Sequence, residues 1–204
     1  MSDREVVVLS GVRTAIADFG GSLKDVPPTE LAGQVVAEAV KRSGLQGADI
    51  GHCVIGSVTH SDRRDMYMGR VAALKGGLPI ETPALTVNRL CGSGLQAVIS
   101  AAQMVLLGDC DAVVAGGAES MTRVPYWLPR ARFGARMGDA TMEDPMMGAL
   151  TCPMGDTHMG ITAENLAEKY SVSREEQDEL AAESHRRAQR AIEGGYFKEQ
   201  ILPI

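Results

Sequence analysis

Aromatic side chains are scarce in this sequence, at 4% of 204 residues, and acidic residues outnumber basic ones. Large aromatic anchors therefore cannot dominate the core, and small, aliphatic and flexible thioether side chains must fill it. The formal net charge of −6 argues against nucleic acid as the main partner, because phosphate backbones need a basic surface. A small anionic ligand needs only a local basic pocket and is compatible with this balance.

Closely paired cysteines and long apolar runs are also lacking. The four cysteines form no C-x-x-C pair and, with the scattered histidines, no zinc-ligand spacing; they are Cys53, Cys91, Cys110 and Cys152. The N-terminus has acidic residues where a signal peptide would be basic, and no apolar stretch approaches the length of a membrane span. We expect reduced thiols, no metal, no membrane partner and a cytoplasmic location.

The first 120 residues alternate between two kinds of apolar pattern. Short continuous runs predict buried strands at residues 5–10, 53–59, 84–89 and 111–115. Apolar residues at helical spacing predict helices at residues 28–43, 64–75 and 94–107. The last helix is apolar nearly all round, so we expect it to be buried on most sides. This order predicts an α/β fold, a layered βαβαβ half-domain with a mostly parallel mixed sheet covered by helices.

The composition changes after Met121, where methionine, proline and arginine become frequent and periodicity is lost. Helices are predicted near residues 162–170 and 174–193, and Ser173 with Glu176 forms a capping box for the second. We therefore divide the chain into a half-domain at residues 1–120 and an irregular, partly helical loop domain at residues 121–204. A long irregular stretch in a compact protein is usually functional.

The segment VNRLCGSGL (residues 87–95) carries most of the chemistry, because Cys91 follows a predicted strand and opens a predicted helix. The macrodipole and unpaired amides at a helix N-terminus favour a thiolate, and the same amides can receive an oxyanion when a thioester carbonyl is attacked. Gly92 and Gly94 lack Cβ atoms, which lets a substrate or a neighbouring backbone approach closely. The pattern predicts a nucleophile for acyl transfer, with these glycines as oxyanion or turn support.

Two other readings of this segment stay open at the level of pattern. A buried structural cysteine with packing glycines fits the same residues. A phosphate-cradling loop is a third interpretation, but the segment has neither GxxxxGK[ST] nor a G-x-G-x-x-G that opens a βαβ unit.

The combination of motifs resembles the thiolase family, and the bacterial β-ketothiolases in particular. VNRLCGSGLQAV resembles the family's nucleophile motif, and GGAESM (116–121) its motif at the end of the fourth strand. GVRTAIADFGGSL (11–23) resembles the family's first loop, and THMG (157–160) followed by ITAENLAEKY its substrate loop. The matches occur in family order over the whole length.

The resemblance implies an acyl-CoA C-acyltransferase (thiolase) that works through a Cys91 acyl-enzyme. Cys91 attacks an acyl-CoA, and the carbanion of acetyl-CoA then attacks the resulting thioester; in reverse, CoA cleaves a 3-ketoacyl-CoA. The implied partners are acyl-CoA and CoA, with no cofactor beyond these substrates. The resemblance places His158, Met159 and Leu150 at the substrate channel and suggests a homo-oligomer, a dimer or tetramer, through the loop that holds Arg130 and Arg136.

This sequence departs from the family in length. Family chains are roughly twice as long, and their second half supplies a histidine, an asparagine and a second cysteine to the site, as well as a strand of the first sheet. We therefore expect this chain alone to be inactive. The open alternatives are a non-catalytic thiolase-like fragment or binding subunit, and a related decarboxylating β-ketoacyl synthase. Glu119, at the end of the predicted fourth strand, is interpreted as a buried structural carboxylate rather than as an acid/base.

Overall fold

The computed structural model describes residues 4–204 and divides the chain into two compact units. Of the described residues, the first unit comprises 4–125 together with Ile201–Ile204, and the second comprises Tyr126–Gln200. The predicted division into domains after residue 120 stays a prediction.

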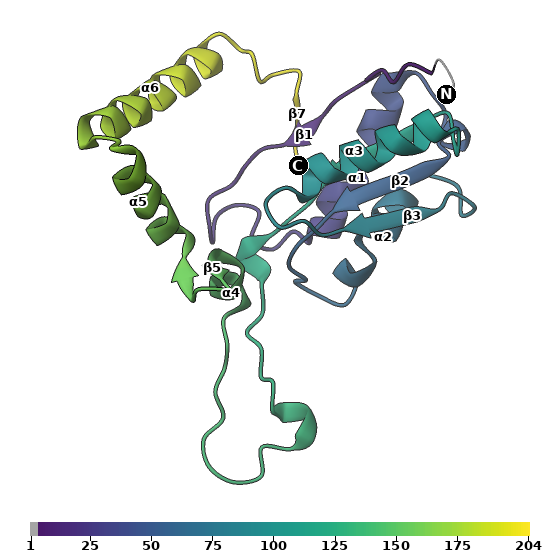
Figure 1. Cartoon of the computed structure of the whole chain (residues 1–204). Coiled ribbons are helices and arrows are strands. Elements are labelled where there is room, and N and C mark those ends of the chain that lie inside the picture. Colours follow the sequence, from purple (N-terminus) through teal and green to yellow (C-terminus); the bar gives the residue numbers. More distant parts are fainter. Residues whose placement is uncertain (1–3) are drawn as a thin grey trace. The chain divides into compact units, whose positions relative to one another are not determined.

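A three-stranded parallel sheet forms the centre of the first unit (Figure 1). Its order is β3 (Ala84–Val87), β2 (His52–Gly56) and β4 (Val113–Gly117), so the predicted mostly parallel α/β fold is confirmed. Gly56 at the end of β2 pairs in register with Val87 of β3 and with Gly117 of β4. The carboxyl ends of all three strands are therefore level, and they form the edge where α/β sheets place their sites.

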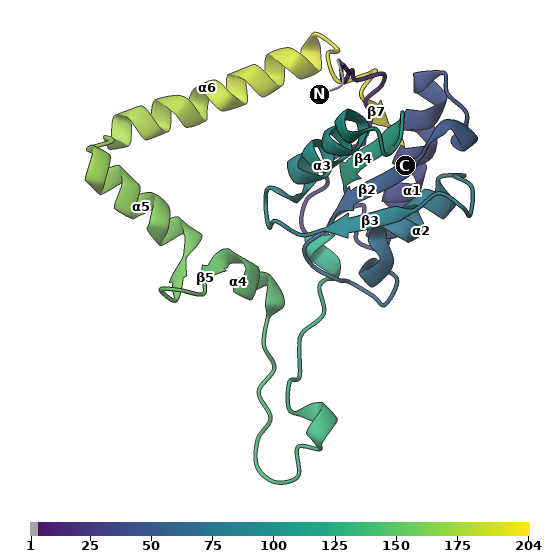
Figure 2. The ribbon, with the colours of Figure 1, turned by 45° about the vertical axis from the view of Figure 1, so that its right-hand side comes forward.

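Helices cover both faces of this sheet. α1 (Pro28–Ser43) and α2 (Met68–Lys75) pack on one face, and α3 (Ser93–Leu107) packs on the other, as the two ribbon views show (Figures 1 and 2). α1 begins with proline at its first position and ends at Gly44, whose φ of 79° is the left-handed conformation that glycine adopts readily.

The hydrophobic core lies between β2 and the α1/α2 layer. It contains small and aliphatic side chains and one methionine, as the shortage of aromatics predicts: Ala32, Val36, Val40, Ile50, Cys53, Ile55, Met68, Ala72, Ala73 and Leu78. Cys53 and Ile55 belong to this cluster, whereas the equally buried Val54 between them faces the opposite side of the sheet, because strand side chains alternate.

α3 contradicts the expectation that it would be buried on most sides. Ala97 and Ala101 are buried, but Leu95 is 65% exposed and Leu107 is 78% exposed. The reason is geometric: one side of the helix contacts the sheet, and the other side is left uncovered by the rest of the first unit. The window Leu90–Leu107 also has a mean hydropathy of 1.6 and is, by length and composition, long enough to cross a membrane, so the prediction that no apolar stretch approaches that length was wrong. In the structure this window contributes a helix that packs on the sheet.

The strand expected at residues 5–10 is absent. Its apolar side chains are exposed, with Val8 at 85%, and the first strand is instead β1 (Arg13–Thr14), which pairs in parallel with β7 (Ile201–Leu202). Between Ser10 and the outer edge of β4 lies a groove of about 380 Å³, whose lining includes Val114, Ala115 and Gly116. A segment forms a strand only when it hydrogen-bonds to a neighbouring strand. In the described chain no strand pairs with the outer edge of β4.

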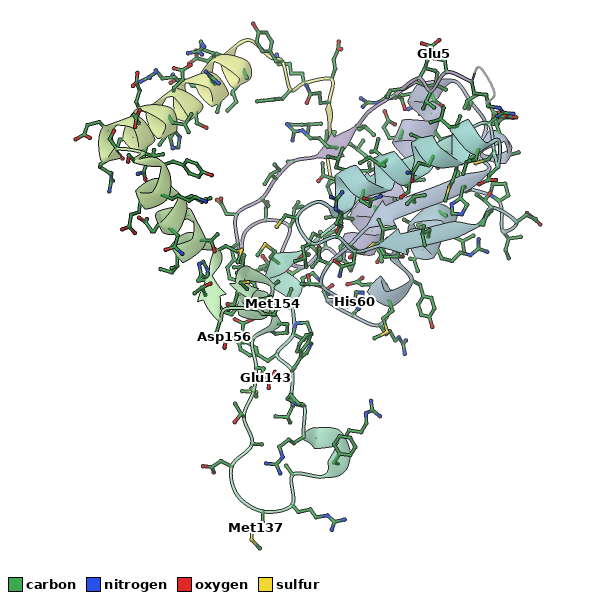
Figure 3. The ribbon with its side chains drawn as sticks, in the orientation of Figure 1. Glu5, His60, Met137, Glu143, Met154 and Asp156 are labelled. Atoms are coloured by element: carbon green, nitrogen blue, oxygen red, sulfur yellow. The ribbon has the colours of Figure 1, made fainter. Side chains whose placement is uncertain are left out.

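The second unit is largely exposed and helical. Its elements are η4 (Ala131–Phe133), α4 (Pro145–Leu150), the antiparallel pair β5 (Thr151–Cys152) and β6 (Thr157–His158), α5 (Met159–Tyr170) and α6 (Arg174–Glu193). The predicted capping box of α6 is confirmed, because the Ser173 hydroxyl accepts from the Glu176 amide and the Glu176 carboxylate accepts from the Ser173 amide. The backbones of Trp127 and Glu143 exchange two hydrogen bonds of 2.9 Å, and Met137, 98% exposed, lies at the tip of the loop between them (Figure 3).

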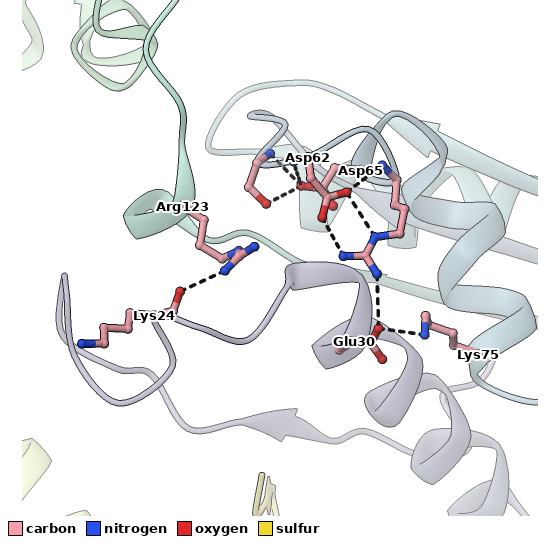
Figure 4. Close-up of polar contacts among 8 residues, drawn as sticks. Lys24, Glu30, Asp62, Asp65, Lys75 and Arg123 are labelled. Carbon is pink, nitrogen blue, oxygen red and sulfur yellow. Dashed lines mark hydrogen bonds and ion pairs between the residues drawn. The ribbon is translucent and has the colours of Figure 1, made fainter.

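Carboxylates anchor the loop that follows β2 in the first unit (Figure 4). The buried Asp65 accepts hydrogen bonds from the amide and the hydroxyl of Ser61, at 2.7 and 2.6 Å. Arg64 donates to Asp62, which lowers the pKa of that carboxyl to about 2, and also lies 3.8 Å from Glu30 of α1. These contacts fix the loop that lies beside the carboxyl edge of the sheet.

The close packing of α3 on the sheet yields a prediction about Gly56. A Cβ added there would lie 2.5 Å from the carbonyl carbon of Ser93, whereas a Cβ added at Gly116 of β4 would meet nothing within 4 Å. Gly56→Ala should lower the free energy of unfolding by about 1–3 kcal/mol, because backbone must move to admit the methyl group. Gly116→Ala is the matched control and should stay within about 0.5 kcal/mol. Urea unfolding measures both; equal values for the two variants would contradict the packing described.

Candidate active site

Cys91 lies in a short turn between β3 and α3, at the carboxyl edge of the sheet, and its thiol-bearing side chain is exposed. The prediction that it directly precedes a helix is confirmed, because Gly92 caps α3 and Ser93 is its first residue. The structural alternative, a cysteine sealed in the core, describes Cys53 instead, which is fully buried.

The turn owes its shape to a left-handed residue and to side-chain hydrogen bonds. Leu90 has a φ of 47°, which is unfavourable for a residue with a Cβ atom. The Leu90 amide donates to the Asn88 side-chain oxygen at 3.0 Å. The Ser93 hydroxyl accepts from the Arg89 amide at 2.8 Å and donates to the Leu90 carbonyl at 2.6 Å. The role of Ser93 was not foreseen from the sequence.

The two glycines expected to support the site differ in their backbone roles. The Gly92 amide donates to the Arg89 carbonyl at 3.1 Å, so in this structure it holds the turn rather than facing a ligand. The Gly94 amide has no acceptor in residues 4–204. Gly94 also packs closely against the carboxyl end of β4, because a Cβ added at Gly117 would lie 3.2 Å from the Cα of Gly94. Of the two, only Gly94 retains an amide for an oxyanion.

Glu119 ties together the ends of the strands. Its carboxylate accepts from the amides of Val58 and Thr59, at 2.8 and 3.1 Å, and from the Thr59 hydroxyl at 2.7 Å. The Val58 carbonyl lies 3.5 Å from the side-chain nitrogen of Asn88, so the loop after β2 also contacts the Cys91 turn. These backbone contacts agree with the structural interpretation of Glu119, although the side chain is exposed rather than buried as expected.

The other predicted site residues belong to the second unit. Leu150 ends α4, His158 ends β6, and Met159 begins α5; Thr151, which follows Leu150, pairs with His158 across β5 and β6. His158 also caps α5, because its Nδ1 accepts from the Gly160 amide at 3.0 Å. The accepting nitrogen carries no proton, so the neutral imidazole holds its proton on Nε2. The structure thus brings these three residues together, and their relation to Cys91 stays a prediction.

The remaining cysteines lie in less reactive surroundings. Burial raises the pKa of the Cys53 thiol to about 12. Partial burial, with Asp109 and Asp111 nearby, also raises the pKa of Cys110. Cys152 is half-buried in β5. Within residues 4–204 no group of three His, Cys, Asp or Glu side chains is placed to hold a metal ion.

Comparison with known proteins agrees with the geometry. Residues 6–204 match the family model for the thiolase N-terminal domain. The chain is 63% identical over 201 residues to beta-ketothiolase BktB of Cupriavidus necator, and 44% identical over 202 residues to an acetyl-CoA acetyltransferase of Pseudomonas aeruginosa. Both alignments cover 98% of this chain and 51% of the relative, so the chain spans about half the length of these curated relatives.

Solved structures give the same result. The acetyl-CoA acetyltransferase of Bacillus anthracis superposes with a TM-score of 0.91 at 44% identity. Human mitochondrial 3-ketoacyl-CoA thiolase in complex with CoA superposes with a TM-score of 0.93 at 37% identity. Each match covers 97% of this chain and 50% of the solved one.

The exposure of Cys91 predicts an order of thiol reactivity. Iodoacetamide at neutral pH should label Cys91 first, since it alone combines exposure with a helix N-terminus. Cys53 should stay unlabelled in the folded protein because it is buried and protonated. Peptide mass spectrometry after timed quenching measures the four rates, and Cys91→Ser is the control for the assignment. Labelling of Cys91 no faster than that of Cys152 would remove the case for an activated thiol.

Proposed function

Since this chain belongs to the thiolase family, we propose that it carries the nucleophile of an acyl-CoA C-acyltransferase, with Cys91 forming the acyl-enzyme. The observation that carries this proposal is the exposed Cys91 in a shaped turn at the start of α3. The relatives' names add support, since they include a beta-ketothiolase, an acetyl-CoA acetyltransferase and a thiolase bound to CoA.

The proposed reaction has two covalent stages. The Cys91 thiolate attacks the thioester carbonyl of an acyl-CoA, a tetrahedral oxyanion forms, and CoA leaves as its thiolate. A second acetyl-CoA loses an α-proton to a base, and its carbanion attacks the acyl thioester. The new carbon–carbon bond gives 3-ketoacyl-CoA, and the Cys91 thiolate is regenerated. The reverse reaction is thiolysis of 3-ketoacyl-CoA by CoA, and the substrates serve without a separate cofactor.

The second unit is proposed to contribute to the substrate channel through Leu150, His158 and Met159. The apolar side chains of Leu150 and Met159 suit an acyl or pantetheine chain, and methionine adapts to varied shapes. His158 is held by its bond to Gly160, which keeps a proton on Nε2 for a substrate carbonyl. The exposed Trp127, Phe133 and Met137 of the same unit support a homo-oligomer built through that loop.

Complete turnover is proposed to need residues equivalent to the relatives' second half. The base, the water-holding amide and the acid that the family resemblance implies have no counterparts assigned in this chain. Two surfaces of the first unit support this requirement. The uncovered side of α3 exposes apolar side chains, and the outer edge of β4 leaves backbone groups without a paired strand. Folded domains normally cover both kinds of surface.

Incubation with acetyl-CoA tests the proposed nucleophile. Intact mass should show one added acetyl group, tandem mass spectrometry should place it on Cys91, and hydroxylamine should remove it as expected of a thioester. Cys91→Ala should abolish the adduct, whereas Cys152→Ala should leave it unchanged. Acetylation at other sites only, in protein whose Cys91 still reacts with iodoacetamide, would contradict the acyl-enzyme.

Catalytic turnover requires a second measurement. The chain extended by residues equivalent to the second half of beta-ketothiolase BktB should cleave acetoacetyl-CoA in a Cys91-dependent manner. Acetyl-CoA binding without any adduct or cleavage in that extended protein would favour a non-catalytic binding subunit.

A further inference from the structure

The Cys91 turn holds its shape through contacts that do not involve the thiol, and we infer that Asn88 and Ser93 are positioning residues for the nucleophile. This inference rests on the proposed function of Cys91. It concerns the residue between them in the chain, Leu90, whose backbone conformation decides where the following peptide and Cys91 lie.

Leu90 adopts a conformation that its own side chain disfavours. Its φ of 47° brings the Cβ atom close to backbone, which is why glycine usually occupies such positions. The Leu90 side chain is 54% exposed, so hydrophobic burial does not hold the residue in place. A disfavoured backbone conformation persists only when surrounding contacts determine it, and such conformations gather at functional sites.

Side-chain hydrogen bonds on both sides of Leu90 supply that determination. The side-chain oxygen of Asn88 accepts a hydrogen bond of 3.0 Å from the amide of Leu90, two residues further along the chain. This is the arrangement of an Asx turn. Ser93 clamps the other side, because its hydroxyl accepts from Arg89 at 2.8 Å and donates to the Leu90 carbonyl at 2.6 Å. Both polar groups of the Leu90 backbone are therefore engaged by side chains that flank Cys91, and the Leu90 carbonyl also accepts from the Ser93 amide at 2.9 Å.

The two clamps also have firm supports. Ser93 is only 5% exposed and lies against the end of β2, where a Cβ at Gly56 would meet its backbone. Asn88 contacts the Val58 carbonyl, and the Val58 amide is bound in turn by the carboxylate of Glu119. The turn is thus fixed to the ends of two strands, and Cys91 is presented at its exposed apex.

This arrangement predicts that the clamps matter only because Leu90 is strained. Ser93→Ala or Asn88→Ala should let Leu90 relax to a negative φ and move Cys91 away from its reactive position. Leu90→Gly removes the conformational penalty, so in a double variant it should restore the original turn without the lost hydrogen bond. A residue that merely stabilises the fold would show no such rescue.

Alkylation of the whole chain by iodoacetamide tests the inference, because the cysteines provide their own controls. Asn88→Ala should slow Cys91 labelling about fivefold, the effect of one lost neutral hydrogen bond. Ser93→Ala should slow it by more, because the Ser93 hydroxyl makes two such bonds. Adding Leu90→Gly should return each rate to within about twofold of the unsubstituted chain. Ser43→Ala removes a hydroxyl that donates to the Val40 carbonyl in the last turn of α1 and should leave the rate unchanged. Protection of Cys53 reports that a variant is folded.

The possible outcomes distinguish a failure of the positioning roles from a failure of the proposed nucleophile. Unchanged Cys91 rates in both folded single variants would overturn the positioning roles, and so would slowed rates that Leu90→Gly fails to restore. If one single variant exposes Cys53 by unfolding, the other single variant and its Leu90→Gly double decide the question. Slow labelling of Cys91 in the unsubstituted chain would instead overturn the proposed nucleophile, and with it the positioning roles that rest on that proposal.

Discussion

The contact between the first turn of α3 and the ends of β2 and β4 is the constraint on which the site depends. Gly56 and Gly117 stand where any side chain would press on the backbone of Ser93 and Gly94. This close approach sets where the helix begins, and the helix start sets where Cys91 lies. The level ends of the three strands then allow Asn88, Val58 and Glu119 to meet around the same turn.

Much of the fold follows from local sequence signals. The span of α1 is marked by Pro28 and Gly44, and that of α6 by its capping box, so both helices were predicted with their observed ends. The position of Cys91 followed from the same kind of signal, a strand, a cysteine and two glycines before a helix. The left-handed conformation of Leu90 has no such signal, because nothing in a leucine marks it. The Asn88 and Ser93 contacts that hold it become evident only when the backbone is known.

The errors share a different physical cause. Residues 5–10 and the outer side of α3 were expected to be buried because they are apolar, and both are exposed. Apolar periodicity reports which surface prefers to be covered, but it does not reveal what covers it. Relatives twice as long, together with an unpaired edge on β4, give both surfaces a consistent explanation within the proposed function. The proposed placement of Leu150, His158 and Met159 at a substrate channel stays a prediction.

The most direct measurement is a crystal structure of the chain after reaction with acetyl-CoA. The proposed mechanism predicts an acetyl group on the Sγ atom of Cys91, with Leu90 at positive φ and the Ser93 hydroxyl between the Arg89 amide and the Leu90 carbonyl. An unmodified Cys91 directed into the interior, with Leu90 at negative φ, would contradict it.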